Sequence, residues 1–151
     1  MKYSTRSRYG LRAMIELAKQ YSKEPILLKD IAERQDISMK YLDHIITPLR
    51  VAGLINRKKG GYILSRPPSQ ISCMEIVNIL EGSLAPVECV DNPDICERVE
   101  YCVAIDVWRE LKKAQNKILD SLTLKDLVER KKSKNNDKKY KFRTKAKNNK
   151  H

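Results

Sequence analysis

Long apolar runs are absent from this 151-residue sequence. None approaches the about 18 consecutive apolar residues that a membrane-spanning helix needs, so we expect no membrane partner. No apolar segment follows the charged residues 1–8, so no secretion signal is expected. Only two histidines and five glycines are present. No Ser/His/Asp set, phosphate-binding glycine loop or paired-carboxylate pocket is recognisable, so we do not expect an enzyme.

Cysteine is scarce, and its four positions are Cys73, Cys89, Cys96 and Cys102. Without an export signal we expect a reducing, cytoplasmic compartment, where spaced cysteines bind metal or sense redox state more often than they form disulfides. Hydrophobic residues make up 41% of the chain, which is enough for the core of one domain with appendages.

The chain has a net charge of +12, and its charged residues are unevenly distributed along the sequence. Residues 1–66 carry 14 Lys/Arg against six Asp/Glu, residues 67–130 carry seven against 12, and residues 131–151 carry ten against one. A basic balance suggests nucleic acid as a partner. The last segment has almost no apolar residues, so we expect a disordered tail that either attracts DNA phosphates without sequence choice or only aids solubility.

Apolar periodicity predicts a mainly α fold with one small β-hairpin. Helices are expected over residues 5–21, 28–35, 38–52, 72–80, 102–122 and 123–132, and two short strands within 54–64. Pro48 is expected to kink or break the third helix. The expected domains are a winged helix-turn-helix at 1–66, a linker helix and loop at 67–101, a dimerisation helix and C-terminal helix at 102–130, and the disordered basic tail at 131–151.

Residues 28–45 carry the pattern of a helix-turn-helix, in which the second helix enters the major groove of DNA. Ala32 is small where the two helices would cross, and Asp36 falls in a turn that needs a left-handed backbone, which Asp tolerates. Asp43 can accept a hydrogen bond from cytosine N4, and His44 can donate to a purine acceptor. A generic three-helix packing unit is the alternative. The predicted DNA-contacting residues of the second helix are Ser38, Lys40, Tyr41, Asp43 and His44.

The predicted hairpin, or wing, has a basic tip formed by Arg57, Lys58 and Lys59. Gly60 and Gly61 follow it and allow a tight turn. Basic residues at such a tip typically meet phosphate or the minor groove, and a charged turn without a role is the alternative.

Three cysteines, Cys89, Cys96 and Cys102, lie within 14 residues in the pattern Cys-x6-Cys-x5-Cys. Three thiolates on a loop that leads into a helix can converge on one metal centre. Zinc fingers and ferredoxins use tighter pairs, so this spacing leaves an iron–sulfur cluster, zinc and a thiol sensor open. Cys73 is set apart and is expected to be a buried structural residue.

Apolar residues between 104 and 122 recur at alternating spacings of four and three, as in a coiled-coil seam. We predict that Trp108, Leu111, Ile118 and Leu122 pair with a second copy of the chain. A homodimer suits helix-turn-helix recognition, since the two subunits read half-sites related by a two-fold axis. Packing of this helix against its own domain is the alternative.

Together these features resemble the IscR-type winged helix-turn-helix regulators, relatives of CymR and NsrR. The resemblance covers residues 1 to about 130. It is carried by segments 1–14, 31–38, 48–54, 60–62, 80–89 and 119–128, with Tyr41, Leu42, Cys96, Cys102 and Trp108. The family implies a dimeric repressor on pseudo-palindromic double-stranded DNA that senses iron–sulfur cluster status and controls cluster-assembly genes. It also implies that Cys89, Cys96 and Cys102 hold an iron–sulfur cluster. The expected type is [2Fe–2S], and [4Fe–4S] is the alternative.

The chain departs from the family pattern at the fourth cluster ligand and at the wing. The position of the family's ligand His holds Ile105, and the N-terminal acidic ligand of the nitric-oxide-sensing branch is replaced by Arg8. The wing is shorter than usual. Two alternatives therefore stand: a cluster-free, thiol- or metabolite-responsive regulator of cysteine or sulfur metabolism of the CymR type, and a small cluster-carrying redox protein.

Overall fold

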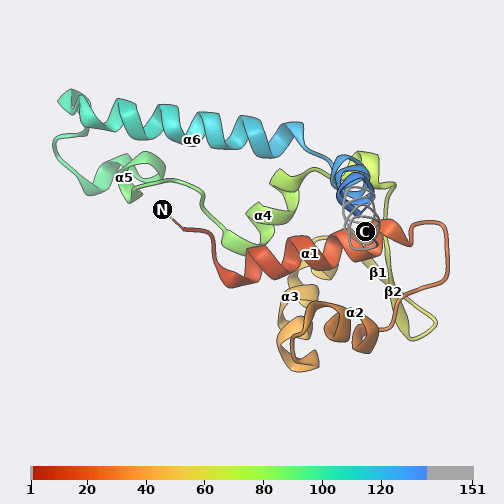
Figure 1. Ribbon diagram of the computed structural model, residues 1–151. Coiled ribbons are helices and arrows are strands. Elements are labelled where there is room, and N and C mark those ends of the chain that lie inside the picture. Colours follow the sequence, from red (N-terminus) through yellow and green to blue (C-terminus); the bar gives the residue numbers. More distant parts are fainter. Residues whose placement is uncertain (1, 136–151) are drawn as a thin grey trace, which may run out of the picture.

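A computed structural model of the chain describes residues 2–135. A globular head holds the first three helices and the only hairpin of the described residues, and a long helix extends beyond the head together with a lobe of short turns (Figure 1). The head elements are α1 (Thr5–Lys19), α2 (Leu28–Gln35), α3 (Met39–Val51), β1 (Ile55–Lys58) and β2 (Gly61–Leu64). The later elements are η1 (Pro68–Gln70), α4 (Cys73–Glu81), α5 (Glu88–Asp91), η2 (Pro93–Ile95), η3 (Val99–Tyr101) and α6 (Ala104–Ser121). The predicted fold class is confirmed.

One apolar core holds the head together and takes side chains from α1 to α4. Met14, Ile31, Leu42 and Ile76 each have essentially no exposed surface. Gly10 of α1 lies against Leu80 of α4 so closely that a methyl group there would overlap it. Any larger residue at position 10 would therefore require the Leu80 side chain to shift. Helix α4 in turn packs against α6. Among residues 2–135, no helix has both the length and the apolar character that crossing a bilayer requires.

Helix α3 is not broken at Pro48, contrary to one of the two outcomes expected from the sequence. It continues to Val51. Pro48 cannot donate a backbone hydrogen bond, but the Thr47 hydroxyl one residue earlier donates to the Asp43 carbonyl at 2.8 Å and ties the same turn of the helix. Leu49, just beyond the proline, is fully buried, and its packing holds the last turn in place.

The hairpin turns at Lys59 and Gly60, which both have positive φ (49° and 77°). Two such residues form the turn that matches the twist of a two-stranded hairpin. Gly61 is not in the turn but begins β2, where a Cβ atom would lie 2.9 Å from the carbonyl oxygen of Ile26. Gly61 thus permits the segment before α2 to approach β2 closely. In this segment Ile26 forms an isolated β-bridge with Tyr62.

A capping box opens α4: the Ser72 hydroxyl accepts from the Glu75 amide, and the Glu75 carboxylate accepts from the Ser72 amide. Cys73 is buried, as predicted. Burial, with a smaller contribution from Asp126, raises the pKa of the Cys73 thiol, so this cysteine stays protonated at neutral pH.

A last helix spans residues 124–135 and returns to the head after α6 (Figure 1). Leu124 at its start is fully buried, and Val128 packs against the same core. The disordered tail was expected from residue 131, but residues 131–135 continue this helix. The rest of the expected tail, residues 136–151, lies outside the described residues.

Candidate DNA-binding surface and cysteine lobe

The turn between α2 and α3 has the backbone that the sequence predicts. Asp36 caps α2 in the left-handed conformation, with φ 55° and ψ 48°. The next amide, of Ile37, donates to the Ala32 carbonyl at 3.1 Å and closes the end of α2. The Ser38 hydroxyl then accepts from the Tyr41 amide at 3.1 Å and opens α3. The left-handed backbone of Asp36 and these two hydrogen bonds together fix the angle at which α3 leaves the turn.

Four of the five residues predicted to contact DNA on α3 are exposed on its outer face. They are Ser38, Lys40, Asp43 and His44. Tyr41 is different, because it is partly buried and packs against the core of the head. Its ring meets that of Tyr9 on α1 edge to face, with centroids 6.0 Å apart. Tyr41 therefore joins the outer face of α3 to α1 and leaves only part of its side chain available to a partner.

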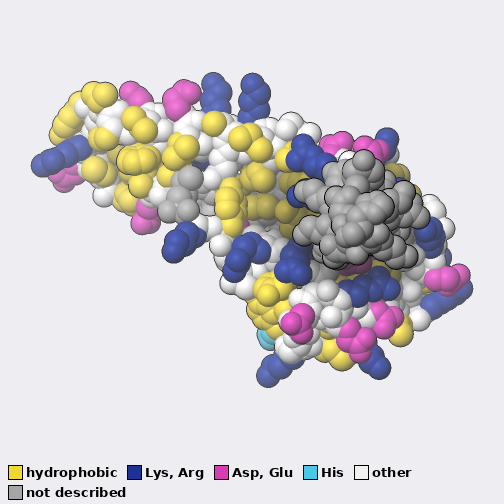
Figure 2. Space-filling model, viewed as in Figure 1, with side chains coloured by type: hydrophobic (Ala, Val, Ile, Leu, Met, Phe, Trp, Pro, Cys, Tyr) yellow, Lys and Arg dark blue, Asp and Glu magenta, His cyan; other side chains and the backbone are white. Residues whose placement is uncertain are grey.

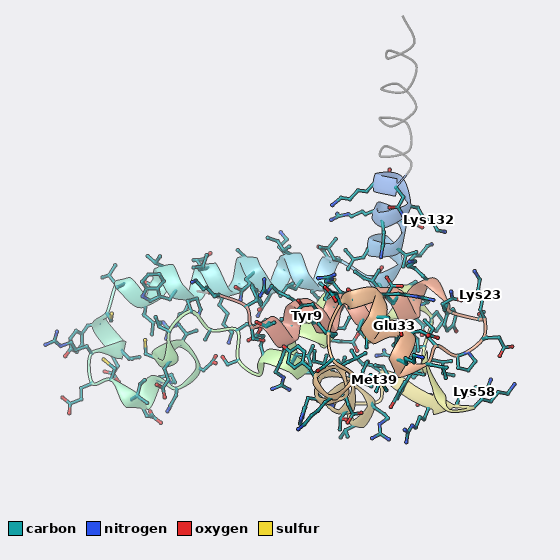
Figure 3. The ribbon with its side chains drawn as sticks, turned by 60° about the horizontal axis from the view of Figure 1, so that its bottom comes forward. Tyr9, Lys23, Glu33, Met39, Lys58 and Lys132 are labelled. Carbon is teal, nitrogen blue, oxygen red and sulfur yellow. The ribbon has the colours of Figure 1, made fainter. Side chains whose placement is uncertain are left out.

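The basic tip of the wing is exposed and lies on the same side of the head as the start of α3. Arg57, Lys58 and Lys59 are all exposed, and Figure 3 shows Met39 and Lys58 on this side. The Arg57 guanidinium lies 5.7 Å from the ring centre of Tyr62, a cation–π distance that partly orients it. One side of the head thus combines a helix N-terminus, exposed polar side chains and three cations.

Arg12 on α1 belongs to the same surface, although no sequence motif marked it. Its guanidinium lies 5.2 Å from the ring centre of Tyr9, whose ring contacts Tyr41. Arg12 is exposed, so its charge is available to a partner. Only the spatial contact of Tyr9 with α3 reveals this, because periodicity alone makes Arg12 one more polar residue on an amphipathic helix.

The other predicted site lies in the lobe formed by residues 85–103, between α4 and α6. No residue of this lobe is buried. Cys89 lies on α5, Cys96 follows η2, and Cys102 follows η3 just before α6. All three are free thiols; Cys96 is exposed and the other two are partly exposed. The lobe therefore brings the three cysteines into one small region of the molecule, far from α3 (Figure 1).

These three thiols fit an iron–sulfur cluster or zinc in donor type, since soft thiolates are the preferred ligands of both. Their present positions do not yet form a metal site: among the described residues, no three Cys, His, Asp or Glu side chains converge on one point. The lobe itself consists of short helical turns and has no buried residue.

The predicted dimer seam is partly open to solvent. Ile105 is the only buried residue of α6, whereas Trp108, Leu111 and Ile118 are exposed. Figure 2 shows hydrophobic side chains gathered at the end of the molecule away from the head, at the left of the view. Leu122 lies instead at the junction with the head, where its carbonyl accepts from the Cys73 amide at 2.7 Å. Val103, just before α6, and Val107 on it are also exposed and widen this apolar face.

Comparisons with known proteins agree with this arrangement. Residues 3–130 match the Rrf2 family, described as "Iron-dependent Transcriptional regulator". The chain is 41% identical over 131 residues to Protein rrf2 of Nitratidesulfovibrio vulgaris, covering 85% of this chain and 87% of that protein. It is 39% identical over 131 residues to CymR of Bacillus subtilis, covering 85% and 90%.

Two solved structures are similar over most of their length. One is CymR of B. subtilis, named there "the Global Cysteine Regulator", with a TM-score of 0.71, 39% identity, and coverage of 85% of this chain and 97% of that one. The other is IscR of T. potens, with a TM-score of 0.69, 39% identity, and coverage of 85% and 87%.

Proposed function

The chain belongs to the Rrf2 family of DNA-binding transcriptional regulators, and from that premise we propose that it is a homodimeric repressor that senses iron–sulfur cluster status through Cys89, Cys96 and Cys102. Cluster-assembly genes are its proposed targets, in the cytoplasm. Its proposed DNA is a pseudo-palindromic operator, since the two heads of a symmetric dimer read two related half-sites.

Operator reading rests on the exposed face of α3 and the wing. Asp43 and His44, exposed near the start of α3, are the proposed contacts to base edges, and the exposed Ser38 and Lys40 are the proposed contacts to edges or phosphates beside them. The proposed phosphate contacts are Arg57, Lys58 and Lys59 on the wing and Arg12 on α1, all exposed. Such contacts position the head without choosing a sequence. Tyr41 mainly fixes α3 against Tyr9.

Dimerisation rests on the exposed apolar face of α6. Within the described residues Trp108 and Leu111 keep more than a third of their surface exposed and Ile118 keeps 61%, and exposed apolar side chains that gather on one face are typical of an interface. Leu122, the fourth residue of the predicted seam, caps α6 at its junction with the head. Pairing of two such helices places the heads at a fixed separation.

One observation carries the sensing proposal: the lobe holds three of the chain's four cysteines, all free and none buried, and has no core of its own. A segment with so little internal packing is open to ordering by a ligand. The cluster would be held by the three lobe cysteines and would supply a centre sensitive to iron and oxidants. The chain's own part is to connect the lobe to α6, which begins two residues after Cys102.

A thiol-responsive regulator of the CymR type is the second candidate. It is favoured by the exposure of Cys96, because an accessible thiol can be oxidised without any metal. The absence of three converging ligands among residues 2–135 also favours it. The two candidates share the DNA-binding head and differ only in what happens at the lobe.

The absorption spectrum of anaerobically purified protein, with iron and sulfide content, separates these candidates. We expect a coloured protein whose visible bands disappear in Cys96→Ala but persist in Cys73→Ala, since Cys73 is buried away from the lobe. A colourless protein, with or without zinc, after anaerobic reconstitution would overturn cluster sensing and leave the thiol-responsive regulator.

A further inference from the structure

One carboxylate in the head is almost completely buried. Glu16, on α1, has 4% of its surface exposed. Because an unpaired buried charge is costly, such a residue needs partners. It has four, contributed by three parts of the chain: Lys19 of α1, Arg34 and Gln35 of α2, and Lys131 of the last helix.

The shortest of these contacts joins the first helix of the chain to the last helix that the structure describes. Lys131 Nζ donates to Glu16 Oε1 at 2.9 Å, across 115 positions in sequence. The Arg34 guanidinium and the Lys19 ammonium reach Oε2 at 3.4 Å each. The side chains of the three cations are partly exposed, whereas the Glu16 carboxylate is buried. Glu16 is therefore the common partner of all three ion pairs.

Lys131 belongs to a helix that is tied directly to α6. Only Leu122 and Thr123 separate α6 from residues 124–135. The junction is fixed to the head by two backbone hydrogen bonds, from Cys73 to Leu122 at 2.7 Å and from Leu124 to Ile71 at 3.0 Å. The orientation of this last helix thus follows the end of the proposed dimer helix.

On the other side, Glu16 holds the end of α2. Its partners Arg34 and Gln35 form the last turn of that helix. The left-handed Asp36 follows at once, and α3 begins three residues later at Met39. Residues that fix the end of α2 therefore also fix where α3 starts.

We propose that Glu16 is a positioning residue that clamps the last helix to α2, and so sets the orientation of the DNA-reading helix relative to α6. This inference rests on the proposed DNA-binding dimer, because orientation relative to α6 matters only when two heads must fit two half-sites together. It assigns a role to Lys131, which lies outside the surface that reads DNA: in Figure 3 its neighbour Lys132 lies on the side of the head away from Met39 and Lys58.

The matched pair Lys131→Met and Lys132→Met tests the clamp. Both remove one charge from the same helix, but within the described residues Lys132 makes no ion pair. In Lys131→Met, Glu16 keeps Lys19, Arg34 and Gln35, so the head stays folded. The full-length protein first selects its operator from a random duplex library, and binding is then measured to this duplex and to one with a single intact arm.

We expect Lys131→Met to reduce the ratio of two-arm to one-arm affinity by about fivefold or more, the range typical of coupled sites. Lys132→Met should leave the ratio unchanged, since loss of a charge alone weakens both duplexes alike. An unchanged ratio in Lys131→Met would overturn the clamp. If wild-type protein selects no sequence at all, the proposed function fails, and the clamp is then decided by the next measurement.

Amide hydrogen exchange of the DNA-free dimer gives that independent readout. Lys131→Met should speed exchange both in residues 124–135 and in the last turn of α2, whereas Lys132→Met should not. In Glu16→Gln the same two regions should loosen, and adding Lys131→Met should then have little further effect, because the two residues act through one contact. Exchange that accelerates only near residue 131, with α2 unchanged, would contradict the proposal.

Discussion

The ring of Tyr9 on α1 meets the ring of Tyr41 on α3 at 86°, with their centroids 6.0 Å apart. This edge-to-face contact is the only aromatic pair found among residues 2–135, and it lies directly behind the surface that α3 presents. It joins the helix that carries Arg12 to the helix that carries Asp43 and His44.

Replacing Tyr9 tests whether this contact supports DNA binding. Tyr9→Ala should lower the free energy of unfolding by about 1 kcal/mol or more, because an edge-to-face pair contributes roughly this amount beyond its buried area. It should also weaken operator binding, since both α3 and Arg12 lose a support. Tyr9→Phe keeps the ring and should behave as wild type. Urea denaturation and operator titration check both effects, and full affinity in Tyr9→Ala would refute the support role.

The left-handed backbone of Asp36 makes a second prediction. A β-branched residue is strained in this conformation, so Asp36→Val should destabilise the head by about 1–2 kcal/mol. Asp36→Gly should be neutral or slightly stabilising, because glycine adopts φ 55° without strain. Thermal unfolding of the two variants checks this. Equal stability of the valine and glycine variants would show that the turn has another conformation in solution.

The acid stability of the head should depend on Glu16. Burial by itself would raise the pKa of this carboxyl, but the hydrogen bond and charge of Lys131, with those of Lys19, outweigh it and hold the pKa below its ordinary value. A carboxyl with a lowered pKa stabilises the folded state above its ordinary pKa, and this contribution is lost as the pH falls through the folded-state pKa. The stability difference between wild type and Glu16→Gln should therefore be largest near neutral pH and shrink in acid. A difference independent of pH would contradict the ionised state of Glu16.

The segment beyond residue 135 can now be tested without disturbing the clamp. Residues 136–151 carry seven Lys/Arg and one Asp. Ending the chain after residue 135 keeps Lys131 and should weaken binding to every duplex alike, with a smaller dependence on salt, because cations at phosphates release counterions without reading sequence. Titrations at several salt concentrations check this, and a changed operator preference would show that the segment contributes to specificity.

Local features of the fold were predictable from the sequence, because neighbouring residues determine them. The bounds of α2 and the capping box at Ser72 follow from signals within a few positions. The left-handed turn at Asp36 follows in the same way. The cysteine spacing located the lobe, since three thiols on one short segment must lie near one another whatever its conformation.

Features that depend on distant parts of the chain were not predictable. The contact of Glu16 with Lys131 spans 115 positions, and no periodicity points to it. For the same reason the last helix extends past the point where its apolar pattern ends: Val128 and Lys131 anchor it to the head. The role of Tyr41 was also only partly predicted, because helical spacing placed it on the outer face whereas Tyr9 draws it partly inward.

In the proposed regulator the state of the lobe controls DNA binding by the head. Operator affinity measured before and after cluster removal is the direct test. One anaerobic preparation of the full-length dimer is divided, the cluster is removed from half, and both halves are titrated with the selected duplex and with a panel of other duplexes. Cys96→Ala serves as the control that should not respond. We predict that the two forms differ in affinity by about fivefold or more on at least one duplex. Equal affinities across the whole panel would contradict it.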